Sequence, residues 1–373
     1  MGNKICHLST VHPWSDTRIF FRECASLAEA GYEVHLIANA DKDFVKDDIT
    51  VHALVADRKS RLYRATVMAY RLYKKAKKID ADLYHFHDPE LIWVGALLKW
   101  RKRKVIFDIH EFIRGQLESK DYIPFNNTFA KLFKYVDRFA SKNFSIILAE
   151  NSYLDFYKDD AENLEVVLNM PEVSKLEQFK VEDRTGKIGI FYLGVVLRER
   201  GLNETLEALN VLNKRGVDFH FHLVGRLPEG LGVELKEMVE GFGISEKVTF
   251  HGLLPIYEAF EVSKECKFGL SLLHPTKNYL ESYSTKVFEY MSVSMPFVVS
   301  DFPLYDFVKE KELGLLVDPF DFEKIADAFE KLLEDTEGNT EMGKRGFVAT
   351  KEAYNWSHQK AKLIKFYEKI LSS

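Results

Sequence analysis

The stretch ESYSTKVFEYMSVSMPFVVSD, residues 281–301, sets two glutamates around an expected helix start and then enters an apolar strand. A helix rises about 1.5 Å per residue, so Glu281 and Glu289 can reach points about 12 Å apart. The helix start between them offers backbone amides and a partial positive charge, which suit a diphosphate, and each carboxylate can accept hydrogen bonds from sugar hydroxyls. The stretch therefore predicts a binding site for a nucleotide-diphosphate-sugar. The plainer alternative is a capped helix with two solvated acids.

The chain has 373 residues, more than one hydrophobic core usually serves, so two domains are expected. Its composition, 46% hydrophobic and 29% charged with a net charge of −5, is typical of a soluble globular protein. Its three cysteines, Cys6, Cys24 and Cys266, have no CxxC spacing, which favours a reducing cytoplasm over a disulfide framework or a zinc ribbon. The first residues resemble a β-strand and not a signal peptide, and no apolar run approaches the roughly 20 residues that span a bilayer. We therefore expect a cytoplasmic protein that is not inserted in a membrane.

Basic residues are concentrated in one segment, residues 58–78, which contains no acid. Apolar residues recur within and just after it at helical spacing, at Leu62, Ala65, Ala69, Leu72, Ala76 and Ile79. This pattern predicts a basic amphipathic helix, which either makes peripheral contact with the anionic cytoplasmic face of the inner membrane or is an ordinary solvated helix. Nucleic acid is not expected as a partner, because the whole chain is acidic and shows no nucleic-acid-binding motif.

Short apolar, β-branched runs alternate with helical patterns along the whole chain, which is typical of parallel α/β layers. In the first half the expected strands are residues 4–8, 33–38, 83–87, 104–109, 144–148 and 165–168. In the second half they are residues 188–193, 219–224, 247–250, 268–273, 296–300 and 315–317. A polar stretch without clear periodicity, residues 172–187, separates the two series and is expected to hold the domain linker. We therefore expect an α/β protein with two doubly wound, Rossmann-like domains, residues 1–172 and 173–355.

Ligands of open parallel sheets bind beyond the carboxyl ends of the strands, so polar residues just after strands are candidate site residues. One loop of this kind carries Gly194, Arg198 and Arg200 ahead of an expected helix. Amides and arginines at a helix start can bind a phosphate, and Arg200 is the first choice for this role. The loop lacks the GxGxxG fingerprint, which argues against a nicotinamide dehydrogenase. Gly225 and Arg226 follow the next strand and are candidates for the same donor site.

Polar residues also follow two neighbouring strands of the first half, namely His85, His87 and Asp88 after one and Asp108, His110 and Glu111 after the next. Imidazoles and carboxylates in this arrangement could hold a catalytic metal ion. The alternative, which we prefer, is hydrogen bonding to a hydroxylated substrate, with Asp108 or Glu111 orienting His110. His85 is expected to face the core side.

The stretch after the first strand contains His12, Asp16 and Arg18 and opens a helix. Asp16 can cap that helix, and Arg18 can pair with a nearby acid. Because they stand at a strand end, these residues are also candidates for binding an acceptor.

The residues described so far resemble the GT-B glycosyltransferases of the large retaining group called family 4, typified by bacterial capsule, exopolysaccharide and lipopolysaccharide enzymes. The resemblance covers nearly the whole chain, and the Glu-x7-Glu stretch followed by Met-Pro-Phe-Val-Val-Ser-Asp is its most specific part. It implies two Rossmann-like domains facing across a cleft, with a closing helix at residues 356–373 packed back on the first domain. It also implies an acceptor-binding N-terminal domain and a nucleotide-sugar-binding C-terminal domain.

The resemblance also implies roles for single residues. Glu281 would bind the hydroxyls of the donor sugar, Glu289 the ribose and Arg200 the diphosphate. His110 would lie beside the transferred sugar, so His110 and Glu281 are the expected catalytic residues. The expected acceptor-binding residues are His12, Asp16, Arg18, His87, Asp88 and Glu111.

One departure from the family pattern concerns the phosphate cations. The family usually has an arginine directly after the loop glycine, where this chain has Val195. Either Arg198 or Lys286 then supplies the second cation, or the leaving group is stabilised less. Such enzymes generally need no bound metal, because cations and a helix N-terminus can offset the charge of the departing diphosphate. No metal and no cofactor besides the nucleotide-sugar donor are expected.

Together these features predict a retaining transfer of a sugar from a nucleotide-diphosphate-sugar to a saccharide or lipid-linked acceptor in cell-surface polysaccharide synthesis. Three alternatives stay open at this point. They are a nucleotide-sugar 2-epimerase of the same fold, a metal-dependent hydrolase, and a non-catalytic scaffold of a polysaccharide assembly complex.

Overall fold

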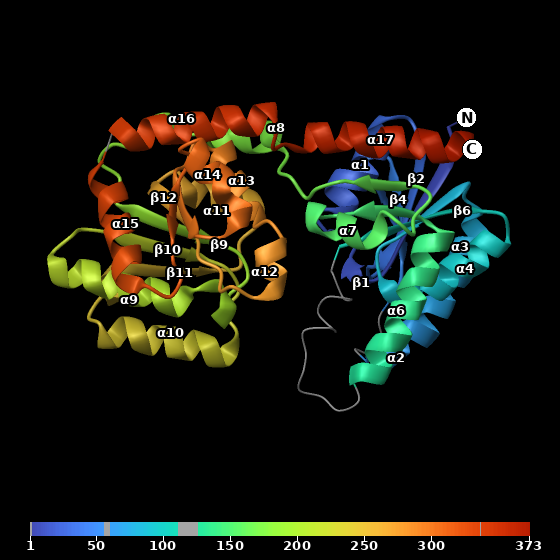
Figure 1. Ribbon diagram of the computed structural model, residues 1–373, viewed down its shortest axis with the longest axis horizontal. Coiled ribbons are helices and arrows are strands. Elements are labelled where there is room, and N and C mark those ends of the chain that lie inside the picture. Colours follow the sequence, from blue (N-terminus) through green and yellow to red (C-terminus); the bar gives the residue numbers. More distant parts are fainter. Residues whose placement is uncertain (1, 56–59, 111–125, 336) are drawn as a thin grey trace. The chain divides into compact units, whose positions relative to one another are not determined.

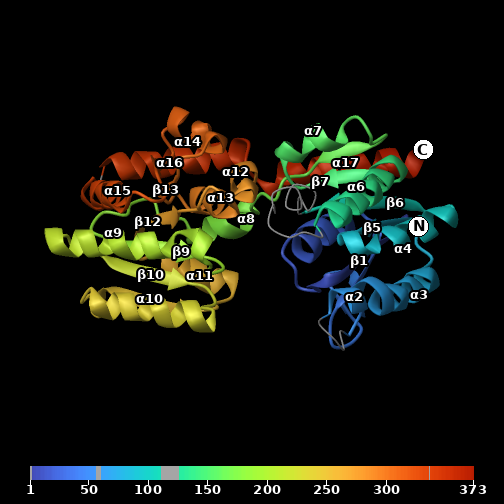
Figure 2. The ribbon, with the colours of Figure 1, turned by 60° about the horizontal axis from the view of Figure 1, so that its bottom comes forward.

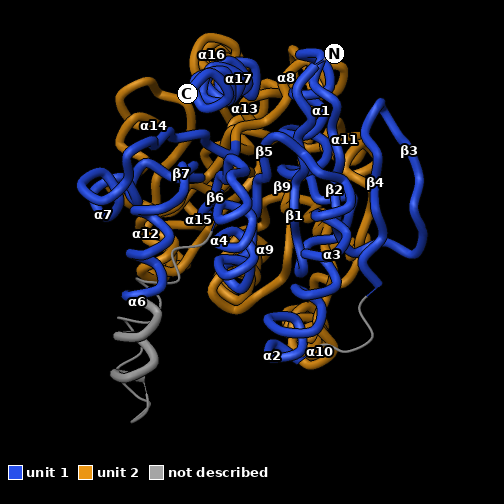
Figure 3. The backbone as a smooth tube through the Cα atoms, turned by 90° about the vertical axis from the view of Figure 1, so that its right-hand side faces the viewer, with its two compact units in different colours: residues 1–169, 356–373 blue, residues 170–355 orange. Residues whose placement is uncertain are grey.

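The computed structural model describes residues 2–55, 60–110, 126–335 and 337–373, and the side chains of all of these except residues 126–133. The chain forms two compact units (Figure 3). Unit 1 is Met1–Asn169 together with Trp356–Ser373, and unit 2 is Met170–Asn355. The division falls after Asn169, whereas the sequence pattern places it after residue 172.

In the described residues, unit 1 contains an eight-stranded sheet in the order β3-β4-β2-β1-β5-β6-β7-β8, in which only the pair of β3 and β4 is antiparallel (Figure 1). The strands are β1 (Lys4–Pro13), β2 (Glu33–Asn39), β3 (Phe44–Lys46), β4 (Ile49–Ala53), β5 (Leu83–Phe86), β6 (Lys104–Ile109), β7 (Ser145–Leu148) and β8 (Leu164–Val166). The helices are α1 (Ala25–Glu29), α2 (Arg61–Tyr63), α3 (Ala69–Ile79), α4 (Ile92–Trp100), α6 (Asn126–Asn143), α7 (Leu154–Tyr157) and α17 (Trp356–Ser372). Two π-helical turns, Ile19–Cys24 and Arg64–Met68, lead into α1 and α3.

Both faces of the unit 1 sheet are buried, because successive side chains of a strand point to opposite sides and helices cover each side. Helices α3, α4 and α6 cover one face, where Leu72 and Phe86 belong to one core cluster. The first π-helical turn, α1 and α17 cover the other face, where Phe20, Leu83 and Phe366 belong to a second cluster (Figure 1). The last helix of the chain thus completes the core of the unit that contains its first strand.

The hairpin of β3 and β4 is absent from the sequence prediction. Lys46 pairs with Ile49, so Asp47 and Asp48 form a two-residue turn, and their φ angles are 51° and 59°. Two successive positive φ angles are typical of the type I′ hairpin turn, which aspartate tolerates better than most residues. The sequence signal is the Asp-Asp pair ahead of the alternating run Ile-Thr-Val-His-Ala.

Unit 2 contains a six-stranded parallel sheet in the order β11-β10-β9-β12-β13-β14. The strands are β9 (Gly189–Leu193), β10 (His220–Val224), β11 (Val248–Gly252), β12 (Cys266–Ser271), β13 (Phe297–Ser300) and β14 (Leu315–Val317). The helices are α8 (Val173–Leu176), α9 (Leu202–Arg215), α10 (Glu229–Gly241), α11 (Ile256–Ser263), α12 (Lys277–Glu281), α13 (Thr285–Ser292), α14 (Asp306–Glu310), α15 (Phe322–Glu334) and α16 (Glu337–Glu352). All twelve expected strands of the two halves are present, and the predicted class of two doubly wound α/β domains is confirmed.

The two faces of the unit 2 sheet are also both covered. Ile190 and Tyr192 of β9 share a core cluster with Leu206 of α9, whereas Phe191 points the other way and contacts Tyr290 of α13, with ring centroids 6.0 Å apart. Figure 1 shows the strands between α9 and α10 below and α13 and α16 above. Because β9 is central and buried on both faces, its last residues are held in place, and so is the start of the loop that follows at Gly194.

The polar segment that was expected to hold the domain linker packs onto unit 2. Arg184 is 4% exposed, and its guanidinium donates to the main-chain oxygens of Ser263 (2.9 Å), Val293 (3.1 Å) and Cys266. The segment lacks a clear periodicity because its regular elements, α8 and a 3-10 turn at Glu177–Phe179, are each only one turn long. Burial lowers the pKa of Arg184 to about 10, yet at neutral pH the group stays charged.

Replacing Arg184 with alanine is expected to lower the free energy of unfolding by about 3 kcal/mol, because buried carbonyls lose their donors. Urea denaturation followed by circular dichroism measures this loss. Lys187→Ala, which removes an exposed pair with Glu265 in the same segment, is the control and should cost less than about 1 kcal/mol. A loss of the same small size for Arg184→Ala would contradict the assignment.

The basic segment at residues 58–78 is helical where it is described, from Arg61 onward, and α3 packs side by side with α4 (Figures 1 and 2). Its apolar stripe differs from the prediction: Met68, Leu72 and Ala76 are buried, but Leu62 is 74% exposed. The π-helical turn explains this difference, because its wider turn rotates the residues before it relative to those after it. Arg58 and Lys59 lie outside the described residues.

None of the helices in the described ranges combines the length and the hydropathy needed to cross a bilayer.

Candidate functional site

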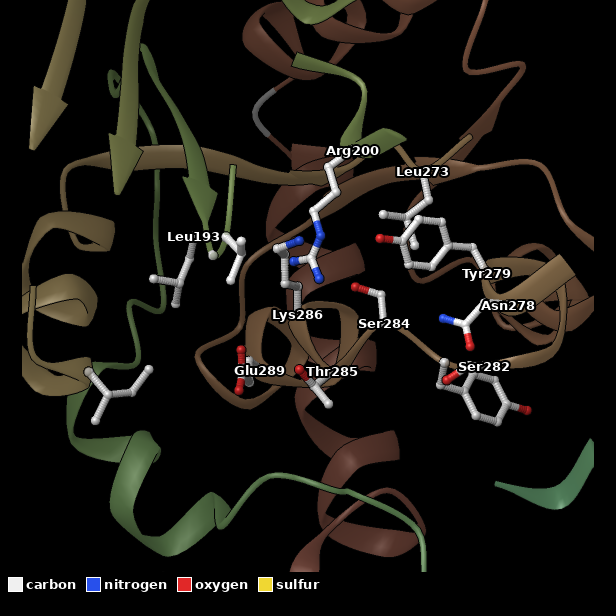
Figure 4. Close-up of a pocket in the computed structure, with 14 residues that line it drawn as sticks. Leu193, Arg200, Leu273, Asn278, Tyr279, Ser282, Ser284, Thr285, Lys286 and Glu289 are labelled. Atoms are coloured by element: carbon white, nitrogen blue, oxygen red, sulfur yellow. The ribbon is translucent and has the colours of Figure 1, made fainter. Parts of the chain in front are cut away.

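A pocket of about 440 Å³ opens in unit 2 at the carboxyl end of β9 (Figure 4). It is lined by Leu193, Gly194, Val195, Arg200, Ile256, Leu273, Asn278, Tyr279, Ser282, Tyr283, Ser284, Thr285, Lys286 and Glu289. The loop after β9 forms one wall, and the start of α13 with the turn before it forms another. The pocket therefore combines a loop at a strand end with a helix N-terminus, an arrangement suited to binding an anion.

Two cations meet at Gly194 in this pocket. A Cβ atom at Gly194 would lie 2.8 Å from Cε of Lys286 and 3.5 Å from Nη1 of Arg200, and the φ angle of Gly194 is 137°. A larger residue would therefore be strained and would displace the lysine. Figure 4 shows the Arg200 and Lys286 side chains pointing toward one another. Positive charge is thus concentrated where the β9 loop meets α13.

Gly201 fixes the loop at its far end. Its φ angle is 66°, and a Cβ atom there would meet the main-chain oxygen of Leu272 at 2.4 Å. Only glycine allows this close approach. Arg200 is therefore held between a glycine turn and the neighbouring strand β12.

Lys286 is 5% exposed, and its Nζ lies 4.8 Å from the ring centroid of Tyr192. Burial, followed by the charge of Arg200, lowers the pKa of Lys286 to about 7, although Glu289 opposes this. Near neutral pH the ammonium group is therefore poised between its charged and neutral forms. A bound diphosphate would favour the charged form.

Three predicted donor residues do not line the pocket. The side chain of Arg198 is 63% exposed and pairs with Glu234, to which its Nη1 donates at 2.8 Å. Arg226 is exposed at the end of β10. Gly225 packs directly against the loop. A Cβ atom at this position would lie 2.0 Å from the main-chain oxygen of Gly194, so only glycine allows this contact.

Of the two glutamates in the stretch 281–301, Glu289 lines the pocket and Glu281 does not. Helix α13 begins at Thr285, between them. Glu289 lies on its first turns and lines the pocket, whereas Glu281 ends the preceding helix α12 and is not among the lining residues. The lining residues also include Asn278 and Tyr279, to which the sequence analysis gave no individual role, and the Tyr279 hydroxyl points toward Arg200 in Figure 4. The sequence signal for them is a polar stretch directly after β12.

In unit 1 the structure joins most of the predicted acceptor residues into one hydrogen-bonded network. Asp88 is buried, and its Oδ2 accepts from Ser9 Oγ (2.9 Å) and from the amide of Thr10 (2.6 Å). The ring of His12 lies between two acids, 3.3 Å from Oδ2 of Asp16 and 3.6 Å from Oδ1 of Asp88. The second half of β1 is therefore held against Asp88, just after β5.

Asp16 caps the π-helical turn as expected, because its Oδ1 accepts from the amides of Arg18 and Ile19, both at 2.9 Å. Burial alone would raise the pKa of Asp16, but hydrogen bonds from the His12 ring and the Ile19 amide hold it well below its usual range. Asp16 is thus a carboxylate at all physiological pH values.

Arg18 is 5% exposed and pairs with Asp108, with its Nε and Nη2 each 3.2 Å from Oδ2. On the other side of Asp108, Nε2 of His110 lies 2.6 Å from the same oxygen. Burial alone would raise the pKa of Asp108, but Arg18 and His110 hold it well below its usual range. The side chain of His110 is 15% exposed, so it is the part of this chain of contacts that faces outward.

His87 is buried, and its Nδ1 lies 3.1 Å from Nε2 of His110. His85 is fully buried on the core side, where its Nδ1 lies 2.6 Å from the Tyr367 hydroxyl of α17. Glu111 lies outside the described residues. Sequence analysis missed His7, Glu23 and Tyr367, which surround these histidines. The signal for His7 is its position opposite His85 in neighbouring strands, but only the sheet order reveals that register.

Comparison with known families identifies both halves of the chain. The profile described as Glycosyl transferases group 1 matches residues 174–348, and the profile described as Glycosyltransferase Family 4 matches residues 17–154.

Individual proteins and solved structures are also similar to this chain, with sequence identities of 25% or less. An alpha-D-kanosaminyltransferase of Streptomyces kanamyceticus is 25% identical over 195 residues, which are 52% of this chain and 48% of that protein. This chain thus aligns with about half the length of the curated relatives it matches. Among solved structures, sucrose-phosphate synthase of Thermosynechococcus elongatus has a TM-score of 0.80 at 18% identity, over 99% of both chains. Anabaena HepE, solved with UDP and glucose, has a TM-score of 0.73 at 14% identity, over 98% of this chain and all of that one.

Proposed function

This chain belongs to the family 4 glycosyltransferases, and on that premise we propose that it transfers a sugar from a nucleotide-diphosphate-sugar to a hydroxyl group of an acceptor. The observation that carries the proposal is the meeting of Arg200 and Lys286 at Gly194, beside the N-terminus of α13. Two cations and a helix start in one pocket suit a diphosphate, and they can stabilise the negative charge that grows on it as it departs.

The proximity of Arg200 and Lys286 also accounts for Val195, which stands where the family usually has an arginine. Arg198 forms an ion pair with Glu234 at the surface, whereas Lys286 is buried and lines the pocket together with Arg200. We assign the second phosphate contact to Lys286, so the positive charge missing from the loop is supplied from the helix. Glu289 is assigned to the ribose, and Glu281, which directly precedes the lining residue Ser282, is assigned to the sugar hydroxyls.

Unit 1 is proposed to bind the acceptor through the partly exposed members of its strand-end network, His12, Asp16 and His110. Arg18, His87 and Asp88 are buried and bonded to protein groups, so their proposed role is to position these three. The acceptor is proposed to be a saccharide or lipid-linked saccharide of cell-surface polysaccharide synthesis, and the sugar is proposed to be transferred with retention of its anomeric configuration. No metal is assigned to the transfer step, since Arg200 and Lys286 line the pocket and can offset the charge of a departing diphosphate.

The test begins with a panel of sugar nucleotides in a thermal-shift assay, because a ligand that binds the native state raises stability by mass action. The donor that raises the melting temperature is then incubated with and without saccharide acceptors, and products are identified by mass spectrometry and nuclear magnetic resonance. Transfer only in the presence of an acceptor, with the donor's anomeric configuration kept, supports the proposal. Release of free nucleotide without any acceptor would instead indicate an epimerase or a hydrolase.

Donor binding is expected to weaken as pH rises above about 7 because of Lys286. In the ligand-free protein its lowered pKa means that the lysine is charged below about pH 7 and neutral above it. A diphosphate binds the charged form, so above pH 7 binding takes up a proton and the association constant falls by up to about tenfold per pH unit. Calorimetric titration with UDP between pH 6.5 and 9 measures this slope. Lys286→Arg, charged throughout, should flatten it, and an equally steep curve in that variant would contradict the role of Lys286.

Peripheral membrane contact is proposed for the basic helix of unit 1. Leu62 is 74% exposed and Tyr70 51% exposed among basic side chains of the segment that follows Ser60. Changing both to aspartate should reduce sedimentation with phosphatidylglycerol vesicles at least about tenfold, since each apolar side chain contributes roughly 1.5–3 kcal/mol when buried. Leu253→Asp in unit 2, at a leucine that is 78% exposed, is the control. Equal sedimentation of the double variant and wild type would exclude this surface.

A further inference from the structure

The core of unit 1 contains a cluster of polar side chains that no step of the proposed transfer uses. His7 lies on β1, His85 on β5 and His87 just after it, and Glu23 lies on the π-helical turn that covers the same face. All four are buried, between 0% and 3% exposed. His7 pairs directly with His85 in the sheet, and His85 and His87 are two residues apart, so the three imidazoles share one face. The polar groups next to these four residues are Arg18, Asp108 and the Tyr367 hydroxyl.

The ligand-type atoms of this cluster converge. Oε2 of Glu23 lies 3.9 Å from Nδ1 of His7, 3.9 Å from Nδ1 of His85 and 4.0 Å from Nε2 of His87. Nδ1 of His7 and Nε2 of His87 are 3.0 Å apart. One ligand atom from each of the four residues lies within 4.8 Å of all the others. Four ligands bound to a zinc ion at about 2.0–2.2 Å would lie about 3.4 Å apart, so the observed spacing is close to that of a tetrahedral shell.

Hydrogen bonds among the described residues satisfy this cluster only in part, because Nδ1 of His7 contacts Nε2 of His87 and Nδ1 of His85 contacts the Tyr367 hydroxyl. The two carboxylate oxygens of Glu23, by contrast, are buried and have no hydrogen-bond partner among the described residues. The distances from Oε2 to the three ring nitrogens are too long for hydrogen bonds. A buried carboxylate oxygen facing three imidazoles without a donor is costly unless something positive binds it.

The surroundings match those of metal ligands in other proteins, whose outer atoms are held by a second layer of contacts. Oε1 of Glu23 lies 2.9 Å from Nε of Arg18, so the carboxylate is held with its other oxygen toward the histidines. Nε2 of His7 lies 3.2 Å from the Tyr367 hydroxyl. Nδ1 of His87 lies 3.5 Å from Oδ2 of Asp108. Two imidazoles and the carboxylate thus each have an outer partner.

We propose that His7, Glu23, His85 and His87 bind one divalent transition-metal ion, with zinc as the best match to three imidazoles and a carboxylate. The ion would join β1, β5 and the π-helical turn inside unit 1. All four protein ligands are used, and the site is buried, so its role is structural. It would hold His87, and through it His110, in place. This inference goes beyond the proposed function, because the donor pocket residues all lie in unit 2.

The test uses the full chain, purified without a polyhistidine tag. Elemental analysis after exhaustive dialysis is expected to find about one zinc per chain. Because the site is buried, metal-free protein is made by unfolding with a chelator, and it is refolded with or without Zn²⁺. Refolding with Zn²⁺ should restore about one equivalent and raise the melting temperature. Refolding with Co²⁺ should give the visible absorption of a four-coordinate cobalt ion.

Variants distinguish this site from surface histidines. Glu23→Gln keeps the shape and packing of the side chain and should lower zinc affinity at least about tenfold, a loss typical of disturbed metal sites. The controls remove histidines from two other imidazole pairs, His35 beside His52 and His222 beside His251, and should keep one zinc per chain. Circular dichroism verifies that each variant is folded.

Two outcomes would overturn the proposal. One is wild-type protein that refolds to the same melting temperature with and without Zn²⁺ and retains less than a tenth of an equivalent. The other is zinc binding that survives Glu23→Gln and disappears in either control variant. His110→Ala should retain its zinc while losing transfer, so failure of the metal site and failure of the proposed function give different results.

Discussion

Replacing Arg200 with alanine is expected to lower kcat/KM for sugar transfer about 10²- to 10³-fold, the loss that follows removal of one preorganised group facing a developing negative charge. Arg200 lines the pocket that is proposed to bind the donor, beside Lys286, and the turn at Gly201 follows it directly. Its guanidinium is therefore already in place when charge grows on the departing diphosphate. Steady-state kinetics with the donor identified by thermal shift measures the effect.

The matched control is Arg198→Ala, two residues earlier in the same loop. Arg198 is exposed and paired with Glu234, so its loss should change kcat/KM less than about threefold, as expected for a surface ion pair. The double variant of Arg200 and Lys286 should lose less than the product of the single effects, because the two cations face one ligand. Equal losses for Arg198→Ala and Arg200→Ala would refute the placement of the diphosphate.

Replacing His110 with alanine is expected to lower kcat about 10²-fold while leaving the dissociation constant of the donor unchanged. The second part follows because every residue of the donor pocket lies in unit 2, whereas His110 lies in unit 1. The first part follows because His110 is the outward-facing end of the chain from Arg18 through Asp108. Single-turnover kinetics measures the transfer step, and UDP titration measures donor binding.

His110→Gln separates a chemical role from a positioning one. Glutamine can still donate to Asp108, so recovery of most of the activity would mean that His110 only holds the acid in place. His35→Ala is the control for loss of a histidine from unit 1, since His35 pairs with His52 and Glu33 elsewhere on the sheet. A donor dissociation constant that rises tenfold in His110→Ala would contradict the separation of roles.

Much of the fold follows from local patterns in the sequence. Strands buried on both faces give apolar runs that need no knowledge of their neighbours, so both sheets could be expected from the chain alone. The sequence analysis did not predict the hairpin at Asp47 and Asp48, because its two strands are short and polar on one side. The exposure of Leu62 could not be foreseen, since a π-helical turn leaves no clear trace in residue spacing.

The donor pocket was predictable in part. Arg200, Lys286 and Glu289 stand beside strand ends or helix starts, and sequence position alone suggests them. The choice between Arg198 and Lys286 depends on Glu234, which lies on α10 and comes near only in the folded unit. Residues on neighbouring strands and covering helices, such as Glu23 and Tyr367, meet the histidines through sheet order and packing that no local pattern encodes.

The return of α17 to unit 1 has a consequence for the order in which the protein matures on the ribosome. Unit 2 is complete once Asn355 has emerged, but unit 1 lacks Phe366 and Tyr367 of its core until α17 has also been synthesised. Domains usually finish in the order in which they are made. Here one face of the sheet of unit 1 stays partly uncovered until α17 has been made, so unit 2 can complete its fold first. Nascent chains stalled after Asn355 has emerged and before α17 has emerged should therefore expose unit 1, and not unit 2, to chaperones.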